Sequence, residues 1–82
     1  MLQGMESEQR VSLVISLTSM RSEEQKHALK LYFVDGVNFA ACAALAEITE
    51  SNLQRAIDRV QKVDSIVEKV KELDWARFKS EK

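Results

Sequence analysis

Apolar residues recur every three or four positions through most of this 82-residue chain, and that spacing predicts helices. The first helix is expected over residues 6–17, where an acidic first turn precedes apolar residues suited to one buried face. These apolar residues are Val11, Val14, Ile15 and Leu17. Part of the same stretch alternates apolar and polar residues, so a strand over residues 11–17 is the alternative. We prefer the helix.

A second helix is expected to begin at residues 22–25, whose sequence Ser-Glu-Glu-Gln has the form of a capping box. In such a box the Ser22 hydroxyl accepts a hydrogen bond from a free backbone amide, and Gln25 returns a hydrogen bond to the cap. The helix is expected to end at Asp35-Gly36, because glycine readily takes the left-handed conformation that closes a helix.

The next two expected helices have the spacing of a helix-turn-helix over about residues 38–60. Asn38 can cap a helix at residues 39–46, whose small apolar side chains predict close packing between neighbours. After a short turn, Thr49 can cap a longer helix that continues to about residue 73 or beyond.

The turn of this motif usually carries glycine where the backbone needs a positive φ, and here Glu47 holds that position. A side chain there costs ~1 kcal/mol or forces a different turn geometry.

Composition agrees with a single small all-α domain over residues 1–82. Proline is absent, only two residues are glycine, 45% are hydrophobic and 30% are charged, which excludes a disordered chain. Twelve Lys and Arg against thirteen Asp and Glu give a formal charge of −1, so any anionic partner must be met locally. A chain this short is marginally stable alone, which makes it a candidate for a dimer.

Catalytic and metal-binding patterns are not found in the sequence. Cys42 lies among alanines and is expected to be a small buried hydrophobe, and His27 is expected on the surface. These single residues leave too few ligands for a metal site, and no phosphate loop or catalytic triad can be read. We therefore expect no enzyme, no metal, no cofactor and no small-molecule substrate. No uncharged run approaches the ~18 residues of a membrane span, and a cytoplasmic location is expected.

Several short pieces of the chain match a known family, namely Ser22-Glu23, Ala28-Leu29, Tyr32, Val34, Gly36, Ile48-Thr49, Asn52-Leu53, Arg59-Val60 and Ser65-Ile66-Val67. Over about residues 13–75 the chain thereby resembles the PapB family of adhesin-operon transcription regulators. The step at Val34-Asp35-Gly36 and the helix after it are also similar to plasmid repressors of the TrfB/KorA type. The resemblance implies a small helical DNA-binding protein that oligomerises on its sites and regulates a fimbrial or plasmid operon. Residues 39–46 carry alanines in place of the family's polar residues, which argues against DNA contacts from that helix.

Candidate contacts with double-stranded DNA lie on the fourth helix, opposite and beside the face expected to be buried. The buried face is Leu53, Ala56, Ile57 and Val60, and the candidate contacts are Thr49, Ser51, Asn52, Gln54, Arg55, Arg59 and Lys62. The uncharged side chains can hydrogen-bond base edges, the basic ones can bind guanine or phosphate, and a cap can leave amides facing a phosphate.

Two features of this face argue against DNA binding. Its charged residues could simply pair with one another at helical spacing. Glu50 and Asp58 would also repel phosphates unless Arg55 or Lys62 neutralised them.

Beyond Val60 the apolar spacing continues at Val63, Val67, Val70 and Leu73, with Ile66 beside them. This stripe predicts a subunit interface, and packing on the first two helices is the alternative. We expect a transcription regulator that binds DNA as a homodimer or larger homo-oligomer, with an oligomerising helix at about residues 50–75. The alternative function is a helical protein-interaction module that does not bind DNA.

Overall fold

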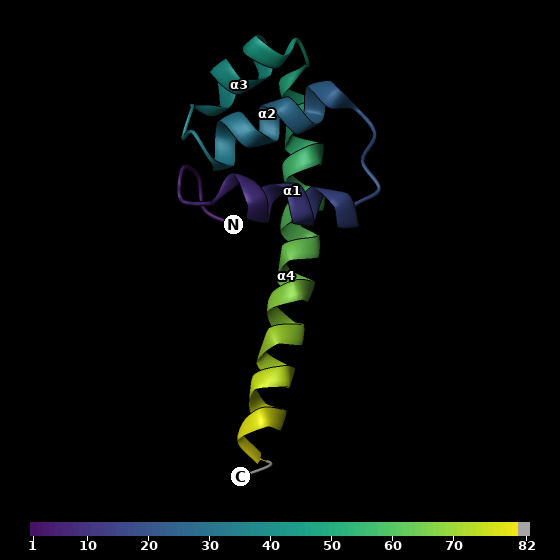
Figure 1. Ribbon diagram of the computed structural model, residues 1–82. Helices are drawn as coiled ribbons and strands as arrows, with labels where there is room; N and C mark the ends of the chain where they lie inside the picture. The colour runs from purple at the N-terminus through teal and green to yellow at the C-terminus, as the bar shows by residue number, and fades with distance from the viewer. Residues whose placement is uncertain (81–82) are drawn as a thin grey trace.

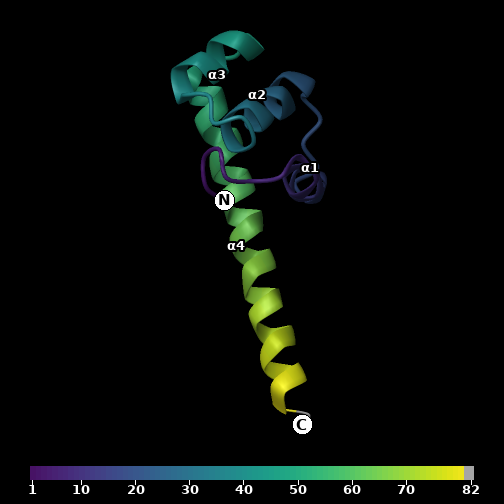
Figure 2. The same cartoon turned by 60° about the vertical axis from the view of Figure 1, so that its left-hand side comes forward.

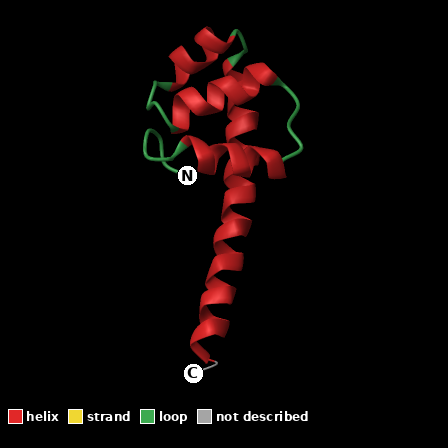
Figure 3. Cartoon of the chain, in the orientation of Figure 1, coloured by secondary structure: helices red, strands yellow, loops and turns green. Residues whose placement is uncertain are grey.

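The computed structural model describes residues 1–80, with side chains to residue 77, and forms a head with a projecting stem (Figure 1). The helices are α1 (Glu8–Leu17), α2 (Glu23–Phe33), α3 (Phe39–Ala46) and α4 (Glu50–Ser80). We call residues 1–64 the head and residues 65–80 the stem. The part of the chain that the structure describes contains helices and loops without strands (Figure 3). The all-α prediction is confirmed, and the alternative of a strand at residues 11–17 is wrong.

Each helix begins directly after a polar side chain that accepts a hydrogen bond from the backbone amide three residues on. The caps are Ser7, Ser22, Asn38 and Thr49, at oxygen–nitrogen distances of 3.1, 3.2, 2.9 and 3.0 Å. Such caps satisfy amides that have no partner inside the helix. The last three caps were predicted correctly, whereas the first helix begins at Glu8 instead of residue 6.

The turn between α3 and α4 closes in the left-handed conformation expected at Glu47. Its φ is 60° and its ψ is 39°, and the Ile48 amide donates to the Ala43 carbonyl at 3.0 Å. The chain therefore keeps the tight turn of a helix-turn-helix and accepts a side chain where glycine would be unstrained. Gly36, which follows α2, has a φ of +74°, as predicted.

The core is built on one face of α4. Leu53, Ala56, Ile57 and Val60 are all buried, as predicted, and α1, α2 and α3 each contact this helix. α1 and α2 lie across α4, while α3 lies near its amino end (Figures 1 and 2). The head thus encloses one side of α4 and leaves the opposite side open to solvent.

α3 packs against both α2 and α4, as expected from its small side chains, but it is buried on one face only. Cys42, Ala43 and Ala46 face the core, whereas Leu45 is 62% exposed. Cys42 is fully buried, as predicted, and its thiol donates to the Val37 carbonyl at 3.3 Å. Burial, with a contribution from the Asp35 carboxylate, raises the pKa of this thiol.

A buried carboxylate joins the N-terminal segment, α1 and α4. Asp64 accepts hydrogen bonds from the Met1 ammonium at 2.9 Å and from the Arg10 guanidinium at 2.6 Å. Burial alone would raise the pKa of Asp64, but these two cationic donors outweigh it, so the pKa lies below its usual value. The hydrogen bond to Asp64 in turn raises the pKa of Arg10, although partial burial opposes this. The side chain of Asp64 is only 9% exposed, so this cluster fixes where α1 crosses α4.

Replacing the buried carboxylate tests this cluster. Asp64→Asn should lower the free energy of unfolding at pH 7 by about 3 kcal/mol, because it leaves the buried Met1 ammonium without its carboxylate partner and removes one of the three carboxylates that pair with Arg10. Since the folded pKa is depressed, the contribution of Asp64 is present above about pH 4 and disappears as the pH falls through the folded value. Denaturant titrations at pH 7 and near pH 2 should therefore show a large difference between parent and variant that narrows at low pH.

The exposed Asp58→Asn provides the control on the same helix and should change the stability by less than about 0.5 kcal/mol. A difference between parent and Asp64→Asn that is equally large at both pH values would contradict the assignment.

Replacing the left-handed residue tests the strain in the turn. Glu47→Gly should leave the stability unchanged or raise it by up to about 1 kcal/mol, because glycine adopts the observed φ without steric cost. Ala44→Gly, at an exposed position inside α3, should instead lower it by about 1 kcal/mol. Thermal unfolding compares the two variants, and equal losses for both would show that Glu47 is not strained.

Candidate nucleic-acid interface

The predicted DNA contacts lie on the side of α4 that the head leaves open. Six of them are exposed and Asn52 is half-buried. The exposed six are Thr49, Ser51, Gln54, Arg55, Arg59 and Lys62. The helix cap and the buried apolar face set this orientation, since together they fix where α4 starts and which side it turns to the core.

Asn52 is already engaged within the head. Its side-chain oxygen accepts a hydrogen bond from the Gln25 amide on α2. The capping-box prediction is therefore half right: Ser22 caps α2, but Gln25 reaches across to α4 and does not return to the cap. This hydrogen bond fixes the Asn52 side chain against α2 and leaves its amide group as the part able to donate.

The charged residues of this face do not neutralise one another. The sequence suggested that Arg55 or Lys62 would neutralise Asp58. Instead, the side-chain amide of Gln54 donates a hydrogen bond to the Asp58 carboxylate at 2.9 Å. Within the described chain, Arg55, Arg59 and Lys62 form no ion pair within 4.0 Å. Three cations without carboxylate partners therefore follow one another at helical spacing along the open side of α4.

A hollow of about 260 Å³ adjoins these cations. It is lined by Met20, Gln25, Asn52, Arg55, Ala56 and Arg59, which come from the α1–α2 loop, α2 and α4. Two guanidinium groups one helical turn apart, beside amide groups, can bind phosphate oxygens or the acceptors of a base edge. Gln25 was not predicted as a member of this site, because a local role in a capping box accounted for this residue without a tertiary contact.

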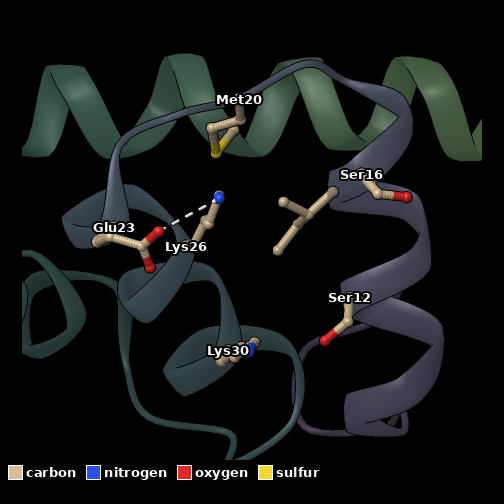
Figure 4. Close-up of a pocket in the computed structure, with 7 residues that line it drawn as sticks. Ser12, Ser16, Met20, Glu23, Lys26 and Lys30 are labelled. Carbon is tan, nitrogen blue, oxygen red and sulfur yellow. Dashed lines mark hydrogen bonds and ion pairs between the residues drawn. The ribbon is translucent and has the colours of Figure 1, made fainter.

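Another hollow, of about 300 Å³, lies between α1 and α2 (Figure 4). Its wall includes Ser12 and Ser16 from α1, with Lys26 and Lys30 from α2. Lys26 pairs with Glu23 at 3.4 Å, drawn as a dashed line in the figure. None of the predicted DNA contacts borders this space, although Met20 lines both hollows.

The residues predicted to form a subunit interface fall into two groups. Val63 is half-buried and packs against the core of its own chain, and Val67 is also half-buried. Val70 is 50% and Leu73 is 70% exposed, and Ile66, which the prediction placed beside the stripe, is 53% exposed. The amino-terminal end of the stripe, at Val63, is thus covered by the head of its own chain, whereas the carboxy-terminal end, at Val70 and Leu73, is exposed to solvent.

The part of the chain that the structure describes contains no group of three or more His, Cys, Asp or Glu side chains arranged to hold a metal ion. None of its helices combines the length and the apolar character needed to cross a bilayer.

Comparison with known proteins identifies the relatives of this fold. The family model described as PapB, adhesin biosynthesis transcription regulatory protein, matches residues 1–73. The chain belongs to the PapB family. It is therefore a transcription regulator, and the resemblance read from the sequence is confirmed for this family. The similarity to TrfB/KorA-type plasmid repressors stays a prediction.

One solved structure supports the fold of this PapB-family member. The crystal structure of E. coli FocB matches with a TM-score of 0.82 and 19% sequence identity, covering 88% of this chain and 82% of the FocB chain. At that identity the match concerns the fold alone. The comparison with curated proteins returned no match.

Proposed function

We propose that this transcription regulator binds double-stranded DNA through the first turns of α4 and controls a fimbrial operon in the cytoplasm. Residues 1–82 would then act as one DNA-binding domain. The observation that carries the proposal is the row of exposed cations Arg55, Arg59 and Lys62, which have no carboxylate partners in the described chain and adjoin a polar hollow.

The position of each residue on α4 suggests its role. In helix-turn-helix proteins the first residues of the second helix reach base edges. Ser51, Gln54 and Arg55 hold such positions, whereas Arg59 and Lys62 lie further along and are suited to phosphates. Thr49 and Asn52 contribute less directly, because the Thr49 hydroxyl caps α4 and the Asn52 oxygen is occupied by Gln25.

Affinity requires more than one copy. A single copy offers few cations, and Glu50 and Asp58 lie beside them, so it should bind near the non-specific range of ~10⁻⁴ to 10⁻⁶ M. Regulation usually requires ~10⁻⁸ M or better. Joining copies closes that gap because the second head binds at a high effective concentration. We therefore propose a homodimer or a cooperative oligomer, joined through the lower part of the stripe, where Val67 is half-buried and Val70 and Leu73 are exposed.

Alanine substitutions test the assigned face. Arg55→Ala and Arg59→Ala should each weaken binding to the upstream DNA of the operon by about 1–3 kcal/mol, since each removes a base or phosphate contact. Helix content and Tm should stay close to those of the parent, because both side chains are exposed. Mobility-shift titrations over a range of salt concentrations measure the effect, and the loss of a phosphate contact should also reduce the salt dependence by about one ion.

Lys71→Ala is the matched control. It removes the same charge from the same helix at an exposed stem position, where Lys71 pairs with Glu68 at 3.5 Å. This variant should bind DNA like the parent. Equal losses in all three variants would show that only net charge matters, and unchanged binding by both arginine variants would mean that the wrong face has been assigned.

A further inference from the structure

Below the ion pair between Glu68 and Arg10, the stem of α4 projects away from the rest of the described chain (Figures 1 and 2). It nevertheless carries exposed apolar side chains at Ile66, Val70 and Leu73. An isolated helix of this length is marginal in water, and a continuous apolar stripe on a surface indicates an interaction site. The stem therefore has a face that needs a partner.

The spacing of the stripe identifies the kind of partner. Val63 and Val70 are seven residues apart, and so are Ile66 and Leu73, which gives the alternating three- and four-residue steps of a coiled coil. We call these four residues the stem seam. In heptad terms the valines occupy a positions, and Ile66 and Leu73 occupy d positions. In parallel coiled coils, valine at a with leucine at d favours two strands, a pattern that Val63, Val70 and Leu73 follow and Ile66 does not.

We propose that the stem seam packs against the same seam of a second copy in a parallel two-stranded coiled coil, which places both heads at the same end. This inference rests on the proposed function, to which it adds the relative orientation of the two copies.

The charges beside the seam favour the parallel arrangement. Lys69 occupies a g position and Asp74 the following e position, and neither makes an ion pair in the described chain. In a parallel pair, Lys69 of each copy faces Asp74 of the other, since g pairs with the next e across the interface. In an antiparallel pair centred on the seam, Lys69 instead faces its own counterpart, and the two positive charges repel.

The seam also continues the row of cations proposed to contact DNA. Arg55, Arg59, Lys62, Ile66, Val70 and Leu73 follow one another in steps of three or four residues along α4. The head packs on a different side of the helix, through Leu53, Ile57 and Val60. Two copies joined at the seam therefore turn their heads outward and their cations toward the common axis.

The two α4 helices must separate above the seam. Arg59 and Lys62 of one copy would otherwise lie against the same cations of the other, which is unfavourable without an anion between them. Val63, which is half-buried against its own head, marks the upper limit of pairing. A forked pair of helices with cations on the inner faces can hold a DNA duplex between them. The basic regions of leucine-zipper proteins bind DNA in this way, since their helices diverge above the coiled coil.

Disulfide cross-linking tests the orientation without DNA. Two single-cysteine variants, Ile66→Cys and Leu73→Cys, are made in a Cys42→Ala background and oxidised. The control is Glu72→Cys, which neighbours Leu73 in sequence but lies on the outer face of the helix, away from the seam. A parallel pair brings each seam position opposite itself, so both variants should form disulfide-linked dimers at least about tenfold faster than the control. An antiparallel pair can place only one position opposite itself.

Cross-linking by both seam variants supports the proposal, whereas cross-linking by one or neither overturns it. Circular dichroism checks that Cys42→Ala is folded. The same variants in the parent background give a second reading, because Cys42 is fully buried there.

Charge exchange gives an independent test. Lys69→Glu and Asp74→Lys should each weaken the dimer about fivefold in sedimentation, and the double variant should restore it, because the two residues face each other only in the parallel pair. Failure of the double variant to restore the dimer overturns the register.

Two variants separate this inference from the proposed function. Arg59→Ala should leave the cross-linking rate unchanged when it is combined with either seam cysteine, and it should lower DNA affinity. Val70→Asp, at an exposed position, should lose both the dimer and tight DNA binding. If the seam variants cross-link but the parent binds no DNA, the coiled coil stands and the proposed function fails. If the parent binds DNA tightly and Val70→Asp binds equally well, the coiled coil and the joining of copies through the stripe are refuted, whereas DNA binding through α4 stands.

Discussion

All three short helices pack against one face of α4, and the rest of the structure follows from this constraint. Leu53, Ile57 and Val60 supply the apolar surface on which α1, α2 and α3 meet. A helix that buries one face must expose the other. The exposed side near the amino end of α4 carries Arg55, Arg59 and Lys62, and packing of the core thereby determines which polar residues are available to a partner.

The buried carboxylate of Asp64 marks where the apolar face of α4 ends. Above it α4 is held by side chains of the core, and below it the helix continues beyond the head (Figure 1). An unpaired carboxylate at this depth would be destabilising, but Arg10 and the Met1 ammonium compensate its charge and tie two segments to α4. Arg10 also contacts Glu68 at 2.6 Å, which extends the ionic contact by one helical turn. The end of the head is therefore fixed electrostatically as well as by packing.

Local sequence patterns predicted much of this fold because capping residues close in sequence determine where the helices begin and end. The caps at Ser22, Asn38 and Thr49 and the left-handed Glu47 all act within a few residues. The Arg10–Asp64 pair joins residues 54 positions apart, so no local rule reports it, although an aspartate four residues after Val60 on a buried stripe was a signal. Alanine tolerates both core and surface, and for that reason the composition of α3 did not reveal its exposed side. The basic face of α4 was predictable from the buried face, whereas the contact of Gln25 with Asn52 required the tertiary fold.

The net charge of the chain is a poor guide to the field that a partner meets. Carboxylates within 4.0 Å neutralise cations on α1, on α2 and in the stem, among them Arg10, Lys26, Lys30 and Lys71. The cations on the open side of α4 have no such partners in the described chain, so positive charge is concentrated there although the formal charge is −1. Since exposed charges more than about 10 Å apart are screened at 0.1 M salt, a phosphate beside Arg55 experiences mainly the charges of this face, where the three cations outnumber Glu50 and Asp58, and not the distant carboxylates. A near-neutral chain can therefore have a local affinity for anions. Two copies turned toward one axis would double the number of cations that face the DNA without changing the net charge of either copy.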